Sequence, residues 1–451
     1  MFRNAISKKR VLSFIELFYV FVSVIALQLE PLLFARVVVS ILLVIYSFVA
    51  DSRKVMILLL LIMPVASNNS IVGNVSLTIV MVMANTVKNC LFFKKNSGDD
   101  KKNGPSRTWL FYALLLLLYS LSVFSFMGVK EQLIYTVKLV AYLLFIKQYI
   151  VECVQCGQSY GDVFSSIIRY LGIGMIISLV CAAFSGNLFD GVSRFSFGDL
   201  SLANTTGIQS SFVVIGLVLI WFMKKSRKID YVIALVCIVI SFATVSRTAV
   251  IMLVVAAFLF LVALIIQGRF VIVFTMVGLL LAGAFVLLQV PAVSSSLESV
   301  YDRFQADDIS NGRYEIWDLT IEEMSANKKI FAFGAGDYYN LDFKFGKRDD
   351  SMAAHNFVLE TWVIYGAVGI IIVILLLLFF IKNVVFAGSR IEKKSVIKRI
   401  YVLIPLLSLL LGLLYSHHFI GNSNIILFVG AFIPIMICRT TNGGAGLKNE
   451  K

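Results

Sequence analysis

A histidine and several arginines stand where long apolar segments end, and these residue types together can bind an anionic group and activate a hydroxyl nucleophile. His355 directly precedes the apolar run that starts at Phe357, and a neutral imidazole can accept a proton from a hydroxyl nucleophile. Arg247 lies in the short turn between two apolar runs, with no acidic neighbour in sequence. Because arginine is the preferred bidentate ligand of phosphate, the pattern indicates a site for an anionic headgroup.

Each of these residues also has a structural interpretation. An arginine near a bilayer surface binds ordinary lipid phosphates, and a lone histidine often serves packing or a helix end. Five ionisable residues fall within apolar runs, where a charge needs a partner, a cavity or a route to the interface. Both kinds of role stay open for these five residues, which are Glu16, Arg36, Lys138, Arg169 and Glu360.

The composition is that of a membrane protein. The chain has 451 residues, of which 59% are hydrophobic and only 15% charged, and its mean hydropathy is +0.91. Many apolar runs approach the roughly 20 residues that span a bilayer as a helix, and they lack the alternation of barrel strands. The sequence therefore predicts an all-α polytopic membrane protein, a single integral membrane domain over 1–451 with twelve to fourteen transmembrane helices.

Charge sets the predicted topology. Lysine-rich loops such as 94–102 and 390–399 fall on one side, which the positive-inside rule makes cytoplasmic. The same rule accounts for the net charge of +14 without a nucleic-acid partner. Residues 291–356 carry twelve acidic and seven basic residues, which suits a large extracytoplasmic loop between transmembrane helices.

This topology turns six cations outward, on the side where cations are normally depleted. Arg36 then lies near the outer end of its span and Glu16 near the inner end of the preceding one, so the two are not expected to pair. The clustering of arginines near the outer surface again points to an anionic ligand. The six cations are Arg36, Lys138, Arg194, Arg247, Arg303 and Arg313.

The large loop should contain a helix that begins at about Asn311. Its apolar positions Tyr314, Trp317, Ile321 and Met324 recur at i, i+3, i+7 and i+10, so they would form one face. Arg313 would then sit in the first turn, where the positive end of the helix dipole disfavours a cation. A bound anion would remove this conflict, and backbone N–H groups would help to hold it.

Two further features lie within this loop and at its C-terminal end. Residues 333–336, Phe-Gly-Ala-Gly, permit a tight turn or a close backbone approach. Asn356 and Glu360 are four residues apart, so they share one helical face and are candidates to line a cavity.

Taken together, these motifs resemble the O-antigen ligase and polymerase superfamily of bacterial envelope enzymes. The resemblance covers the second half of the chain best, while the first 160 residues carry little beyond topology. It rests on Arg194 with Asn204-Thr-Thr-Gly207, Thr244-Val-Ser-Arg-Thr248, Asn311-Gly-Arg-Tyr-Glu-Ile-Trp317, Phe333-Gly-Ala-Gly336, Ala354-His-Asn-Phe-Val-Leu-Glu360 and Tyr365-Gly-Ala-Val-Gly369.

The resemblance implies a glycosyltransferase in the bacterial cytoplasmic (inner) membrane, with its active site on the extracytoplasmic face. The donor would be a glycan on undecaprenyl diphosphate, used without a cofactor or metal. Arg247 and Arg313 would hold the diphosphate, and His355 would activate the acceptor hydroxyl. The predicted substrate-binding residues are Arg36, Arg194, Arg303, Trp317, Asn356 and Glu360.

Three functions remain in view. A polymerase would build a capsule or O-antigen type polysaccharide from lipid-linked repeat units, alongside a chain-length regulator and a flippase in the same membrane. A ligase would move the same glycan to a lipid A core or another acceptor. A flippase or transporter of lipid-linked sugars ranks below both, since no internal repeat is evident and the polar residues gather at the large loop.

Overall fold

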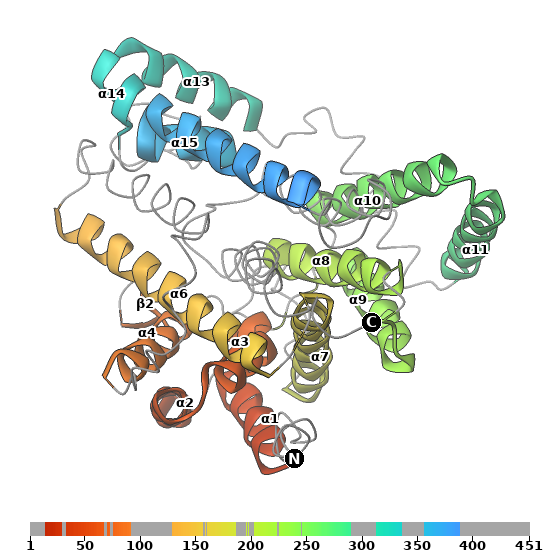
Figure 1. Ribbon diagram of the computed structural model, residues 1–451, viewed down its shortest axis with the longest axis horizontal. Helices are drawn as coiled ribbons and strands as arrows, with labels where there is room; N and C mark the ends of the chain where they lie inside the picture. Colours follow the sequence, from red (N-terminus) through yellow and green to blue (C-terminus); the bar gives the residue numbers. More distant parts are fainter. Residues whose placement is uncertain are drawn as a thin grey trace, which may run out of the picture.

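The computed structural model confirms an all-α architecture, with one short two-stranded hairpin as its exception. Figure 1 shows the helices gathered in a bundle, with α13 (Arg313–Ala326) and α14 (Lys328–Phe333) at one edge beside α15 (Phe357–Ala387). The structure describes residues 14–28, 33–66, 70–72, 75–91, 129–156, 158, 160–185, 195, 197, 203–222, 225–244, 246–289, 313–335 and 356–387.

Apart from α13 and α14, which lie in the large polar loop, the described helices coincide with the apolar runs of the sequence, because each run is long enough to satisfy its backbone internally and to bury one side. The first half contains α1 (Phe14–Gln28), α2 (Leu33–Val49), α3 (Ser52–Ala66), the antiparallel strands β1 (Ser70–Val72) and β2 (Val75–Ser76), α4 (Leu77–Leu91), α6 (Val129–Gln155) and α7 (Tyr160–Ser185). The second half contains α8 (Ala203–Phe222), α9 (Lys228–Ala243), α10 (Arg247–Ile266), α11 (Phe270–Leu288), α13 (Arg313–Ala326), α14 (Lys328–Phe333) and α15 (Phe357–Ala387).

Three described helices are long and apolar enough to cross a membrane, and they include the segments Gly161–Phe184, Thr248–Ile266 and Val358–Leu375. The predicted total of twelve to fourteen spans stays a prediction, since the apolar runs at 108–126, 402–415 and 424–438 lie outside the described residues. The side of the membrane on which each loop lies also stays a prediction.

The shortest apolar run forms the centre of the bundle. Every residue of α3 from Val55 to Val65 is buried, as expected for a helix that is apolar all round. It packs against α1, α4, α6 and α7. The approach to α7 is close because Gly174 has no side chain: a Cβ there would lie 2.6 Å from the carbonyl oxygen of Leu61.

Side-chain contacts define one end of the bundle, called here the Arg169 end. Lys225 Nζ lies 2.7 Å from Asp162 Oδ1, which joins the end of α8 to the start of α7. Arg53 at the start of α3 donates through Nη1 to Cys156 Sγ, just beyond α6, at 2.7 Å. Lys54 Nζ lies 2.7 Å from Glu16 Oε1, so Glu16 pairs at this end, as its predicted depth requires.

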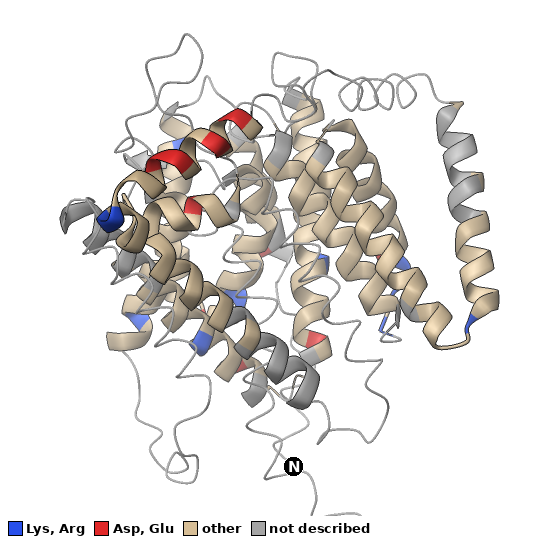
Figure 2. Cartoon of the chain, turned by 90° about the horizontal axis from the view of Figure 1, so that it is seen from above, with Lys and Arg blue, Asp and Glu red and all other residues tan. Residues whose placement is uncertain are grey.

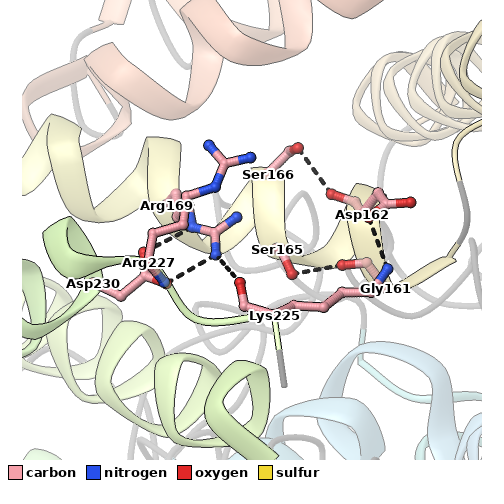
Figure 3. Close-up of polar contacts among 8 residues, drawn as sticks. All are labelled: Gly161, Asp162, Ser165, Ser166, Arg169, Lys225, Arg227 and Asp230. Carbon is pink, nitrogen blue, oxygen red and sulfur yellow. Dashed lines mark hydrogen bonds and ion pairs between the residues drawn. The ribbon is translucent and has the colours of Figure 1, made fainter. Parts of the chain in front are cut away.

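Arg169 itself is buried and paired. Its Nε and Nη2 donate to Asp230 Oδ1 and Oδ2 at 2.7 and 2.8 Å, and Nη2 also donates to the carbonyl of Lys225 at 2.5 Å (Figure 3). Asp230 in turn accepts from the backbone N–H of Arg227 at 2.7 Å. The structure thus assigns Arg169 a structural role, locking α7 to the start of α9.

The opposite end, called here the Arg247 end, follows from the helix directions. It holds the ends of α3, α7 and α9, the starts of α2, α4, α8 and α10, and the β1–β2 hairpin. Figure 2 places α13, marked by its acidic residues, at the upper edge, while the turn between α10 and α11 lies at the lower right. Therefore α13 belongs to the end at which α10 begins.

Candidate functional site

The turn before Arg247 is held by a buried layer of hydroxyl groups. Ser246 precedes α10, and its Oγ accepts from the N–H of Ala249 at 3.4 Å. Ser211 on α8 donates to the Ala249 carbonyl at 3.1 Å, and Ser210 lies 2.8 Å from Ser241 on α9. Since every one of these hydroxyls is buried and bonded, the start of α10 has a fixed position.

A glycine lets α8 reach this turn. A Cβ on Gly207 would lie 2.7 Å from Thr244 Oγ1 and 3.1 Å from Ser246 Cβ, so a larger residue would push the turn away. The two sequence motifs that contain Gly207 and Arg247 are therefore in direct contact. The sequence motif alone predicts no role for Gly207, which becomes evident only from this contact.

A third motif reaches the same place. The N–H of Phe195 donates to the carbonyl of Ala243, at the end of α9, over 3.2 Å. Arg194 itself lies outside the described residues, but its neighbour is attached four residues before Arg247. The structure thus brings the Arg194 segment to the α9–α10 turn.

Arg313 begins α13, as the sequence predicted, although the predicted apolar face is partly wrong. The buried positions are Ile316, Thr320 and Met324, at most 2% exposed, while Tyr314 and Ile321 are 57% and 43% exposed. The helix is rotated because it packs against α14 and α15 rather than lying flat on an apolar surface. Trp317 is partly buried beside this cluster and makes an edge contact with Tyr314.

Two glycine motifs join α14 to α15. Gly334 and Gly366 both have positive φ, 83° and 69°, and α15 is broken at Gly366. A Cβ on Gly334 would lie 2.6 Å from the Ile364 carbonyl oxygen, and one on Gly366 would overlap the backbone of Ala332. Only glycine fits either position, because positive φ and backbone contact both exclude a side chain.

Hydrogen bonds also connect α14 to the first turns of α15, at the contact called here the α14–α15 crossing. The N–H of Ala335 donates to the carbonyl of Val363 at 2.6 Å, and Trp362 Nε1 donates to the Phe331 carbonyl at 3.0 Å. The first turns of α15 are therefore held by α14, while its later residues Ile372 and Val373 join the main bundle core. This crossing of α14 and α15 confirms that residues 333–336 permit a close backbone approach.

His355 lies outside the described residues, but the residue after it is well defined. Asn356 Oδ1 accepts from the N–H groups of Val358 and Leu359 at 2.9 and 3.3 Å, so Asn356 is the N-cap of α15. That role accounts for its side chain without a cavity. Glu360, one turn later, is 1% exposed.

The remaining predicted residues divide in two. The side chains of Arg247, Arg313 and Lys138, and all of Arg303, lie outside the described residues, so the roles predicted for them stay predictions. Arg36 is described: it is half-buried in the first turn of α2, and its Nε and Nη2 are buried. The positions of Arg36, Arg247 and Arg313 are all at the same end of the molecule.

Comparison with known families agrees with these motifs. Residues 232–374 match the family model described as O-antigen ligase, and this range contains the α9–α10 turn, the start of α13 and the α14–α15 crossing. Comparison with curated proteins and with solved structures gave no match. On the matched segment and the motifs within it, the second half of the chain is similar to the O-antigen ligase family.

Proposed function

We propose that the protein is an outer-face polymerase that extends a polysaccharide on undecaprenyl diphosphate. The family supports glycosyl transfer of the ligase or polymerase type. In the proposed reaction, the growing chain moves from its lipid diphosphate to a sugar hydroxyl of a new lipid-linked repeat unit. The enzyme is a multi-pass protein of the inner membrane, and its product is a capsule or O-antigen type glycan.

The observation that carries the proposal is that two arginines occupy the first positions of two helices at one end of the molecule. Arg247 begins α10 and Arg313 begins α13, and both fall in the matched range. A cation at a helix N-terminus is disfavoured by about 0.3–1 kcal/mol. A diphosphate reverses this sign, because it binds both the guanidinium groups and the unpaired N–H groups of the first turn.

The chemistry needs charge stabilisation on one side and a base on the other. The acceptor oxygen attacks the anomeric carbon, the bond from that carbon to the diphosphate oxygen breaks, and the electron pair leaves with the diphosphate. Fixed guanidinium groups stabilise the charge that develops on the leaving group. His355 takes the proton of the acceptor hydroxyl as that bond forms.

The α14–α15 crossing supports this assignment by its position. Arg313 begins the helix that leads into α14, and His355 immediately precedes the N-cap of α15. Because Gly334 and Gly366 fix the two helices backbone to backbone, the segments that carry the arginine and the histidine are held relative to each other. Catalysis requires such fixed geometry between the leaving-group site and the base.

The decisive experiment supplies purified enzyme with lipid-linked repeat units and, separately, with the same donor plus a lipid A core. A ladder of lipid-linked products from the repeat unit alone is expected for the polymerase. A single transfer to the core without a ladder would identify a ligase instead. Movement of the lipid-linked unit across a vesicle membrane without a new glycosidic bond would identify a transporter.

A further inference from the structure

Arg36 differs from the other cations inside the bundle. Among the described lysines and arginines that are not exposed, each of the others has a partner for its charged group. Arg169 bonds Asp230, Lys54 bonds Glu16, and Lys225 bonds Asp162. Arg53 donates to Cys156, and Lys88 donates to the carbonyl of Ala50 at 2.8 Å. The Nε and Nη2 of Arg36 are buried and have no hydrogen-bond partner within the described ranges.

The side chain of Arg36 starts on the buried face of α2. Ser40, Leu43 and Ser47 follow it at i+4, i+7 and i+11, and each is at most 8% exposed. Phe34, Val37 and Ile41, which are 82%, 49% and 53% exposed, lie on the other face. Arg36 therefore does not extend from the face that meets bulk lipid.

The depth of Arg36 follows from the pairing of α2 with α4. Asn85 Nδ2 donates to the Ser47 carbonyl at 2.8 Å, and Lys88 binds the Ala50 carbonyl, so the two helices run in parallel with an offset of 38 residues. This offset places Arg36 level with the β1–β2 hairpin that precedes α4. Arg36 is thus at the Arg247 end, away from the ion pairs of the Arg169 end.

Arg36 is also far from the position of Arg247. The helix α2 packs against α1 and α4, whereas α10 packs against α8, α9 and α11. In Figure 1 α2 lies at the lower left, and α3 and α7 stand between it and α8 and α10. At about 8–10 Å per packed helix pair, the two positions are separated by roughly 20 Å or more. One diphosphate is too small to contact both, whereas an oligosaccharide of several sugars can span the gap.

We propose that Arg36 binds the diphosphate of the second lipid-linked substrate, the acceptor. This inference rests on the proposed polymerase function. The two buried nitrogens of Arg36 have no acceptor among the described residues, which is unfavourable, and a phosphate supplies both negative charge and bidentate acceptors. A polymerase needs two diphosphate sites one repeat unit apart, because the acceptor presents its far sugar to the donor while its own diphosphate stays at the membrane. A ligase acting on a lipid A core has no such requirement.

The test separates the two substrates. Initial rates are measured with a lipid-linked donor whose acceptor hydroxyl is blocked, while the concentration of one of two acceptors is varied. One acceptor is the repeat unit on undecaprenyl diphosphate, and the other is the methyl glycoside of the same repeat unit. The variants are Arg36→Ala, Arg36→Lys and the control Arg269→Ala, which removes an exposed cation beside α11.

For Arg36→Ala we expect KM for the lipid-linked acceptor to rise about 10- to 100-fold, the range of a charge-assisted hydrogen bond. KM for the methyl glycoside, KM for the donor and kcat should be unchanged. Arg36→Lys should raise the first KM by a smaller factor, because it keeps the charge without the planar fork. Arg269→Ala should behave as the wild type with both acceptors.

Three results would overturn the inference. An equal rise of KM with both acceptors would place Arg36 at the sugar or in the fold. Unchanged KM values together with loss of a co-purified phospholipid, seen by native mass spectrometry, would make the ligand a membrane lipid. If Arg36→Ala does not fold, an unchanged KM in Arg36→Lys would reject the site. Failure of the proposed polymerase function can be distinguished from failure of the Arg36 proposal, because in that case the wild-type enzyme forms no ladder.

Discussion

The two ends of the bundle differ in how their charged side chains are paired. At the Arg169 end, Arg169, Lys54 and Lys225 are each within 2.7 Å of a carboxylate oxygen. At the Arg247 end, Arg36 has two buried nitrogens without a partner in the described part of the chain, and Arg247 and Arg313 begin helices. Charges that neutralise one another need no ligand, whereas a half-buried cation such as Arg36, without a partner among the described residues, favours an anion, as our proposal for the Arg247 end requires.

The largest effect is expected for His355→Ala. Loss of a positioned base should lower the rate of chain growth about 10²- to 10⁴-fold, while donor binding largely survives. Rates of ladder formation and binding of the labelled donor are the measurements. His355→Gln, which keeps hydrogen bonding but cannot take the proton, should be nearly as slow. Near-normal polymerisation by the glutamine variant would reduce His355 to orienting the acceptor.

At the Arg169 end, Asp230→Ala should act on stability rather than on chemistry. It leaves the buried guanidinium of Arg169 uncompensated, which costs about 3–5 kcal/mol. Thermal unfolding in detergent should show the loss, and the double variant Arg169→Met with Asp230→Leu should recover much of it. The rate per folded molecule should stay at the wild-type value. A specific loss of kcat in the double variant would contradict the structural assignment of this end.

Arg247→Ala and Arg313→Ala should each reduce the rate about 10²- to 10³-fold, as removal of a group that stabilises a developing anion does. Expression and thermal stability should be close to those of the wild type, in contrast to Asp230→Ala. Lysine at either position should restore only part of the activity. Full activity of the alanine variants would mean that these arginines bind ordinary membrane lipid.

Gly366→Ala should disturb the connection between α14 and α15. A side chain at φ 69° is strained and meets the backbone of Ala332, at a cost of about 1–3 kcal/mol. Activity should fall with stability, because the segments next to His355 and Arg313 shift. Gly278→Ala in α11 is the matched control, since nothing lies within 4 Å of a Cβ there. Equal stability and activity of the two variants would show that the α14–α15 crossing does not position the site.

The smallest expected effect is an increase in stability rather than a loss. Arg36→Met should raise the stability of the ligand-free enzyme by about 1 kcal/mol, because it removes a half-buried charge whose two buried nitrogens have no partner among the described residues. We expect the unfolding temperature of Arg36→Met to rise, whereas that of Asp230→Ala should fall under the same conditions. A fall as large as that of Asp230→Ala would show that Arg36 has a structural partner.

Some details of the site were beyond the reach of the sequence. The heptad-like spacing of α13 suggested that Tyr314 and Ile321 were buried, yet contacts with α14 and α15 bury Ile316 and Thr320 instead. Likewise, Asn356 shares a helical face with Glu360 in sequence, but its amide oxygen is used as an N-cap. Spacing gives the relative angle of side chains on a helix, and only the neighbouring helices decide which angle is buried.

The sequence by itself predicted the helical membrane architecture, helices that start near Arg247 and Arg313, and the resemblance to the O-antigen ligase family. These features depend on local chemistry: runs of apolar residues, capping residues and short motifs. The tertiary structure alone decided that Arg169 pairs with Asp230, 61 residues away, that Gly334 meets Gly366, and that Arg36 stays without a partner among the described residues. Such pairings depend on which helices become neighbours, because that packing is set by the whole buried surface rather than by any one segment.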